Sequence, residues 1–175
     1  MIDVNVTLGR SPFRRVPLEG PALPARLAEL GIKEAFVGHF DALLFEDIAD
    51  VNARLASEAV STIVKLHPVG VVNPLLPDWR EDVRRCKHVH KMSGIRLHPE
   101  FHGYGPADEA FRELLALATE QGLHVQISWR FEDVRTLHPA LKLATWTNAE
   151  ALVLADVVSK TPGLRLVVLN AQTDL

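Results

Sequence analysis

A cycle of short apolar run, loop and helical segment repeats along the sequence and constrains the fold more than any other feature. Six runs have the length and composition of β-strands, and the segments between them carry apolar residues three or four positions apart, as helices do. The strands are predicted at 2–9, 33–38, 65–73, 94–99, 123–129 and 164–170, and the helices at 25–30, 46–59, 78–90, 108–121 and 148–160. Strands that alternate with helices form parallel sheets with right-handed crossovers. The sequence therefore predicts an α/β fold.

The first strand indicates which α/β fold to expect. Its polar residues Asp3, Asn5 and Thr7 alternate with apolar residues, so one face of the strand is polar. A strand of this kind within such a cycle is typical of a TIM-like (β/α)8 barrel, with the polar face in the lumen. A complete barrel needs roughly 250 residues, and this sequence has 175. We expect one partial barrel domain over 1–175 with about six βα units; either the last two units are absent from this chain or a partner covers the gap.

Composition narrows the classes of partner and compartment. The net charge is −3 and no basic stripe is present, so nucleic acid is not an expected partner. No apolar run is long enough to span a membrane, and the N-terminus lacks the pattern of a signal peptide. The single cysteine, Cys86, excludes an intramolecular disulfide and fits a reducing compartment. We expect a cytoplasmic protein in which Cys86 is a packing residue.

Polar side chains occur at the predicted C-terminal end of every strand. In a parallel barrel these ends meet at one rim, where such barrels carry their active sites. From the first strand to the sixth, the candidates are Asn5, Thr7, His39, Asn73, Arg96, His98, Ser128 and Asn170. We expect them to converge on a pocket that binds or transforms a small molecule. The alternative for each residue is a hydrogen-bonded lumen position without a chemical role.

Two of these residues have side chains suited to catalysis. His98 can accept a proton near pH 7, and the Arg96 guanidinium can hold a ligand carboxylate. The alternative for Arg96 is an ion pair with Asp3 in the barrel floor. Arg14 and Arg15, which are adjacent in the sequence after the first strand, are expected on a solvated face.

Eight histidines raise the question of a metal site. His88 and His90 lie two residues apart on a predicted helix, where side chains at that spacing do not face each other. His98 and His102 could chelate an ion, although their spacing is common by chance. We therefore predict no cofactor, with a zinc-like divalent ion as the alternative.

Four stretches resemble the amidohydrolase-related proteins, the amidohydrolase 2 family of metal-dependent hydrolases and decarboxylases related to aminocarboxymuconate-semialdehyde decarboxylase. They are residues 2–9 (IDVNVTLG), 94–99 (GIRLHP), 122–128 and 162–170. The resemblance implies a (β/α)8 metallohydrolase barrel and a small substrate with a carboxylate or carbonyl group.

The sequence departs from this family at the metal ligands. Family members usually carry Asp-x-His-x-His in the first strand, and here Asn5 and Thr7 stand at the two histidine positions. The family histidines of strands five and six fall on Ser128 and Asn170, and the strand-eight aspartate has no counterpart. Asn, Thr and Ser are weak ligands for zinc-like ions. We therefore expect a hydrolase or decarboxylase that does not use the usual metal site; the alternative is a non-catalytic member that binds a small ligand or serves as a subunit. A homo-oligomer is expected in either case.

Overall fold

The computed structural model describes residues 1–15, 22–133, 137–138, 140–141 and 143–171. Its strands are β1 (Ile2–Leu8), β2 (Glu34–His39), β3 (Lys65–Val71), β4 (Gly94–Leu97), β5 (His124–Ser128) and β6 (Leu166–Leu169). Its helices are α1 (Ala22–Glu29), η1 (Phe40–Leu43), α2 (Ile48–Glu58), α3 (Trp79–His88), α4 (Pro99–His102), α5 (Glu109–Glu120) and α6 (Asn148–Ser159). Every predicted strand and helix is present with ends shifted by a few residues. The short helices η1 and α4 fall in segments that were predicted as loop or strand exit.

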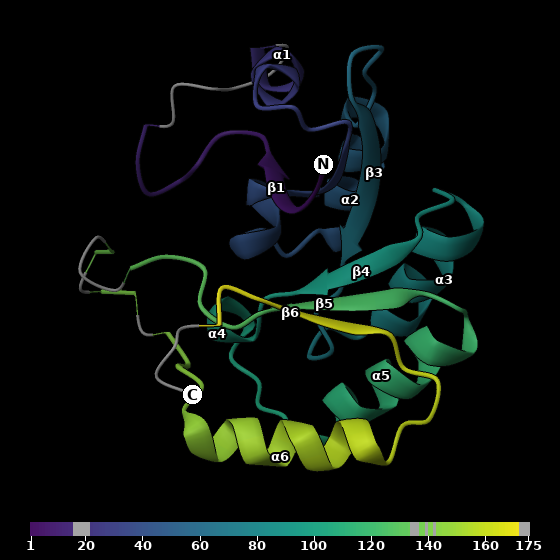
Figure 1. The fold of residues 1–175 in the computed structure, drawn as a ribbon. Helices are drawn as coiled ribbons and strands as arrows, with labels where there is room; N and C mark the ends of the chain where they lie inside the picture. The colour runs from purple at the N-terminus through teal and green to yellow at the C-terminus, as the bar shows by residue number, and fades with distance from the viewer. Residues whose placement is uncertain (16–21, 134–136, 139, 142, 172–175) are drawn as a thin grey trace.

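The six strands form one parallel sheet in chain order, β1-β2-β3-β4-β5-β6. In a flat sheet, strands about 4.8 Å apart would separate β1 from β6 by roughly 24 Å. The side chains of Asn5 in β1 and Asn170, directly after β6, instead meet at 2.8 Å. The sheet therefore curls into an open barrel (Figure 1), and the α/β, TIM-barrel-like prediction is confirmed.

The helices cover the outside of this curl with apolar faces. In α5, for example, Phe111, Leu114, Leu115 and Ala118 are buried at the three- and four-residue spacing that predicted the helix.

The loops that follow β1 and β5 lie on the same side of the sheet in Figure 1. The chain thus brings two distant loops to one end of the barrel.

Strict alternation holds in only part of β1. Val6 and Leu8 are buried as predicted, but Ile2 and Val4 are 57 % and 40 % exposed. The pairing with β2 shifts register between Asp3 and Val6, and such an irregularity changes the direction in which side chains point. β1 is also an edge strand of the sheet, so in the described residues no strand pairs with its outer side.

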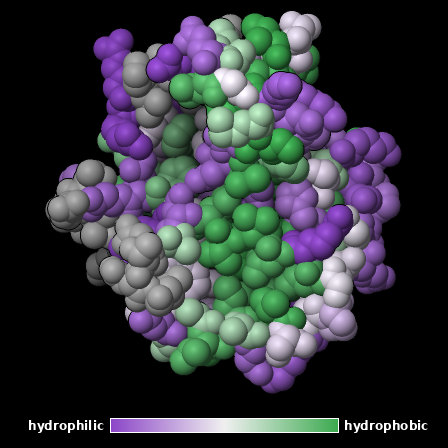
Figure 2. All heavy atoms as spheres, in the orientation of Figure 1, coloured by the Kyte–Doolittle hydropathy of each residue, from purple (hydrophilic) through white to green (hydrophobic). Residues whose placement is uncertain are grey.

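An apolar surface lies on the face where β6 and α6 are seen in Figure 1, and Figure 2 shows it in the middle of the same view. Val167 and Val168 of β6 are each 37 % exposed, and Leu152 of α6 is 75 % exposed.

Among the described helices, none has the length and apolar character needed to cross a membrane. The predicted homo-oligomer stays a prediction.

Candidate functional site

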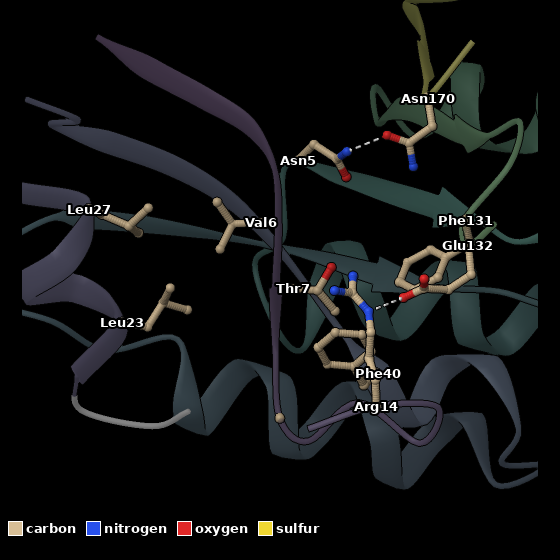
Figure 3. Close-up of a pocket in the computed structure, with 11 residues that line it drawn as sticks. Asn5, Val6, Thr7, Arg14, Leu23, Leu27, Phe40, Phe131, Glu132 and Asn170 are labelled. Atoms are coloured by element: carbon tan, nitrogen blue, oxygen red, sulfur yellow. Dashed lines mark hydrogen bonds and ion pairs between the residues drawn. The ribbon is translucent and has the colours of Figure 1, made fainter. Parts of the chain in front are cut away.

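A pocket of about 400 Å³ lies at the C-terminal mouth of the open barrel, between β1 and the end of β6. It is lined by Asn5, Val6, Thr7, Gly9, Arg14, Leu23, Leu27, Phe40, Phe131, Glu132 and Asn170. Figure 3 shows its two polar pairs, Asn5 with Asn170 and Arg14 with Glu132. Three of the predicted site residues, Asn5, Thr7 and Asn170, therefore share one pocket.

The amide pair closes the gap between the two edge strands. Asn5 Nδ2 donates to Asn170 Oδ1 at 2.8 Å, and the backbone N–H of Asn5 donates to Asp3 Oδ1 at 2.9 Å. Asn170 has a φ of +54°, a left-handed conformation that asparagine adopts more readily than most residues. This backbone conformation, directly after β6, places the Asn170 amide at the pocket.

The second polar pair joins the loops after β1 and β5. Arg14 Nε donates to Glu132 Oε1 at 3.2 Å. The Glu132 side chain is 8 % exposed and the Arg14 side chain 63 % exposed. The expectation that Arg14 lies on a solvated face is thus met in part, but its guanidinium also forms part of the pocket wall.

Aromatic rings form the rest of the wall near this ion pair. Phe40 and Phe131 meet edge to face with ring centroids 5.9 Å apart. A second depression of about 340 Å³ shares Phe131, Glu132 and Asn170 with the pocket. The mouth therefore presents aromatic, amide and guanidinium groups to the pocket and to this adjoining depression.

Arg96 lies in the barrel interior beneath this pocket and is 1 % exposed. Its Nε donates to Gln126 Oε1 at 2.8 Å, its Nη1 to the Val6 carbonyl at 3.0 Å, and its Nη2 to the carbonyls of Val4 and Phe36. Burial lowers its pKa to about 10, so the group stays charged at neutral pH. The role of Arg96 as a carboxylate clamp stays a prediction, and all three of its guanidinium nitrogens already donate to protein oxygens.

No ion pair joins Arg96 to Asp3 within the described residues; the carboxylate of Asp3 accepts from the Asn5 backbone instead.

Gly38 explains how β2 admits the large Arg96 side chain. A Cβ at Gly38 would lie 2.9 Å from Arg96 Nη1. Glycine at this position is therefore needed for the guanidinium to reach the carbonyls of β1.

His98 lies directly behind the pocket wall. It is 3 % exposed, and its ring centroid is 5.6 Å from that of Phe131, which lines the pocket. Burial, followed by the charges of His102 and Arg96, lowers the His98 pKa well below its ordinary value. Its Nδ1 has no hydrogen-bond partner in the described part of the chain. His98 is therefore a neutral imidazole with an available ring nitrogen, separated from the pocket by one side chain.

The remaining predicted residues do not line this pocket. His39 is 5 % exposed and sits behind Gly9, where an added Cβ would lie 2.6 Å from the His39 ring. Asn73 turns back on its own loop, because its Oδ1 accepts from the Leu75 backbone. Ser128 is buried, and its Oγ has no partner among the described residues.

The charged and aromatic residues of the pocket were not singled out from the sequence as a site: Arg14, Phe40, Phe131 and Glu132. Arg14, Phe131 and Glu132 lie in loops, and Phe40 begins the short helix η1. The Arg14–Glu132 pair joins residues 118 positions apart in the chain. Charged residues after strands one and five were the only available signal, and nothing in their spacing indicates that they meet.

The parallel curled sheet with its pocket at the C-terminal mouth defines a (β/α)8-type barrel architecture. The family model described as Amidohydrolase matches residues 20–170. The chain belongs to this amidohydrolase family, as the resemblance in the sequence predicted.

Solved structures with the same fold include several decarboxylases. A 2,6-dihydroxybenzoate decarboxylase from Rhizobium matches with a TM-score of 0.67 and 14 % identity, over 95 % of this chain and 65 % of that one. A manganese-bound 5-carboxyvanillate decarboxylase from Novosphingobium aromaticivorans matches with a TM-score of 0.66 and 19 % identity, over 89 % of this chain and 50 % of that one. An IDCase from Metarhizium anisopliae matches with a TM-score of 0.64 and 13 % identity, over 95 % and 64 %.

This chain spans less than two thirds of the length of these three structures. At such identities the likeness establishes the fold alone. No curated protein matches the sequence.

The family and the manganese-bound neighbour imply a metal, which the residues at the matching positions do not fit. Asn5 and Asn170 bond to each other, and Thr7 and Ser128 offer hydroxyl groups. These four neutral side chains lack the imidazole that suits zinc and the carboxylate that suits manganese. Among the described residues, no group of three His, Cys, Asp or Glu side chains is placed to hold an ion.

Proposed function

We propose that this chain acts on a small carboxylate- or carbonyl-containing molecule as a hydrolase or decarboxylase of the amidohydrolase family. The observation that supports this is the pocket at the barrel mouth, where three residues on family metal positions, Asn5, Thr7 and Asn170, lie together. Barrels of this type carry their chemistry at that end. The decarboxylase activity of structurally similar proteins favours a carboxylate substrate.

The amide pair supplies hydrogen-bond donors to such a substrate. Asn170 uses its Oδ1 to accept from Asn5, so its Nδ2 remains as a donor toward the pocket. A fixed donor near a carbonyl or carboxylate oxygen stabilises negative charge that develops there during reaction. The bond to Asn5 holds the Asn170 amide in one orientation and so reduces the reorganisation that binding requires.

His98 is the proposed proton acceptor. It is neutral because burial lowers its pKa, so a ring nitrogen can take a proton, as a general base must. Its ring packs against Phe131, and a change in the Phe131 rotamer is needed to connect His98 with the pocket. We expect His98→Ala to abolish turnover while the circular dichroism spectrum stays native; unchanged turnover would eliminate this role.

A second candidate function is binding without catalysis. The burial of His98 behind Phe131 and the neutral donor set at the metal positions favour it. The pocket and its polar pairs are the same in both proposals, and they differ only in whether a bound ligand is transformed.

One experiment separates the two. The probe is 2,6-dihydroxybenzoate, which a structurally similar enzyme decarboxylates, with binding measured by calorimetry and carbon dioxide release measured in parallel. Turnover that survives a chelator and is lost in Asn170→Ala supports the enzyme, whereas binding without turnover supports the binding protein. The control is Asn73→Ala, which removes an amide outside the pocket.

The same experiment can overturn each proposal. Turnover that a chelator abolishes and manganese restores would contradict catalysis without the family metal site. Absence of binding by this probe and by a panel of small carboxylates would contradict both functions.

A further inference from the structure

We propose that Arg14 binds the carboxylate of the ligand and that Glu132 positions it. This inference rests on the proposed function, since it takes the pocket between β1 and β6 as the ligand site. It assigns the specificity of that site to a residue of the loop after β1.

The guanidinium of Arg14 has one edge occupied and one edge open. Its Nε donates to Glu132 Oε1, whereas within the described residues Nη1 and Nη2 make no hydrogen bond. The two terminal nitrogens of arginine match the two oxygens of a carboxylate and bind them as a bidentate pair. In Arg96, by contrast, Nε, Nη1 and Nη2 all donate to protein oxygens. Arg14 is therefore the cation that can offer a free fork at the pocket.

Glu132 fixes the direction of that fork. Its side chain is 8 % exposed, and the residue it pairs with is Arg14. A buried carboxylate is costly without a partner, so Glu132 favours conformations in which Arg14 stays at the pocket wall. The Arg14 side chain remains 63 % exposed, which leaves its terminal nitrogens accessible to a ligand. An arginine held in place before binding loses less conformational freedom when the ligand arrives.

The other pocket groups complement this charge. Among the residues described as lining the pocket, Arg14 is the one cation and Glu132 the one anion. The amides of Asn5 and Asn170 are neutral and lie at another level of the pocket, while Phe40 and Phe131 flank Arg14 in Figure 3. The site therefore fits a planar molecule with a carboxylate at the Arg14 end and an uncharged hydrogen-bonding group at the amide end.

The test compares a carboxylate with its neutral isostere. Binding of 2,6-dihydroxybenzoate and of 2,6-dihydroxybenzamide is measured by calorimetry on the wild-type chain and on Arg14→Gln and Arg14→Lys. We expect both variants to lose at least about tenfold in affinity for the carboxylate and to keep the affinity for the amide within about twofold. Lysine keeps the positive charge but lacks the two parallel N–H donors of the guanidinium. A loss of carboxylate affinity in Arg14→Lys therefore separates bidentate hydrogen bonding from charge attraction alone.

The control and the positioning role each have a variant. Arg15→Gln makes the same change of net charge next to Arg14 but outside the pocket, and we expect it to leave both affinities unchanged. Glu132→Ala frees the Arg14 side chain, and we expect carboxylate affinity to fall about three- to tenfold with amide affinity unchanged. Glu132→Gln keeps an oxygen that can accept from Nε and should restore carboxylate binding to within about threefold of wild type.

The outcomes distinguish the two proposals. If the wild-type chain binds neither these probes nor any member of the panel of small carboxylates, the proposed function and this inference fail together. If the wild-type chain binds the carboxylate and Arg14→Gln binds it equally well, only the assignment of Arg14 is wrong. If both Glu132 variants behave as wild type, the positioning role is wrong while the role of Arg14 stands.

Discussion

Replacing Arg96 with methionine tests whether this residue stabilises the barrel or serves the ligand. Methionine keeps an unbranched stem of similar length but removes every donor. The substitution leaves Gln126 Oε1 and the carbonyls of Val4, Val6 and Phe36 without their guanidinium partner. Each hydrogen bond to a charged group contributes about 1.5–3 kcal/mol, and the contributions of bonds that share one group do not add fully. We expect the free energy of unfolding to fall by about 3–5 kcal/mol, because several buried acceptors lose their donor at about 1–3 kcal/mol each.

The assay is urea denaturation followed by circular dichroism and tryptophan fluorescence. Arg80→Met is the matched control, because Arg80 pairs with Glu113 at the surface with 60 % of its side chain exposed, and a surface pair contributes about 0–1 kcal/mol. Arg96→Lys should fall between wild type and Arg96→Met, since an ammonium group cannot reach β1, β2 and β5 together. A loss below about 1 kcal/mol for Arg96→Met would refute the structural role and return Arg96 to consideration as a carboxylate clamp.

Two further predictions follow from buried titratable groups. Burial lowers the folded-state pKa of His98 below 6.5, so below that pH the unfolded chain binds more protons than the folded chain. The free energy of unfolding of wild type should therefore fall by up to about 1.4 kcal/mol per pH unit relative to His98→Gln as the pH falls below 6.5. A constant difference between the two unfolding free energies from pH 8 to pH 5 would contradict this. Burial raises the pKa of the Cys86 thiol to about 12, so a thiol reagent at pH 8 should modify the chain only after unfolding in urea; rapid modification of the native chain would contradict the burial of Cys86.

The order of strands and helices was predictable because each element carries its own signal. The apolar spacing in the segment that became α5 and the apolar residues Val69 and Val71 of β3 are local properties. Chain order then fixes a parallel sheet once strands and helices alternate. The register shift in β1 was not predictable, since it depends on pairing with β2. The helix α4 was missed because Pro99 marks the end of a strand and the start of a helix equally well.

The candidate site was predictable where strand ends supply it and not where loops do. Asn5, Thr7 and Asn170 follow from alternation and from the position of strand ends, and they line one pocket. His39 and Asn73 also stand at strand ends, yet each turns to partners in its own neighbourhood, namely the Asp41 and Leu75 backbones. Which way such a side chain turns depends on local hydrogen bonds that a strand pattern does not contain.

The pocket depends on the curvature of the whole sheet more than on any local motif. Asn5 belongs to the first strand and Asn170 follows the last, so their contact at 2.8 Å exists only because five successive strand pairings bring the two edges around. Arg96 of β4 maintains that curvature from the inside, since its guanidinium reaches across to the β1 carbonyls of Val4 and Val6. Arg96 in the interior and the Asn5–Asn170 pair at the mouth therefore link strands across the barrel, and neither offers a free charge at the pocket. The charge for the proposed ligand recognition falls to Arg14 in the adjoining loop.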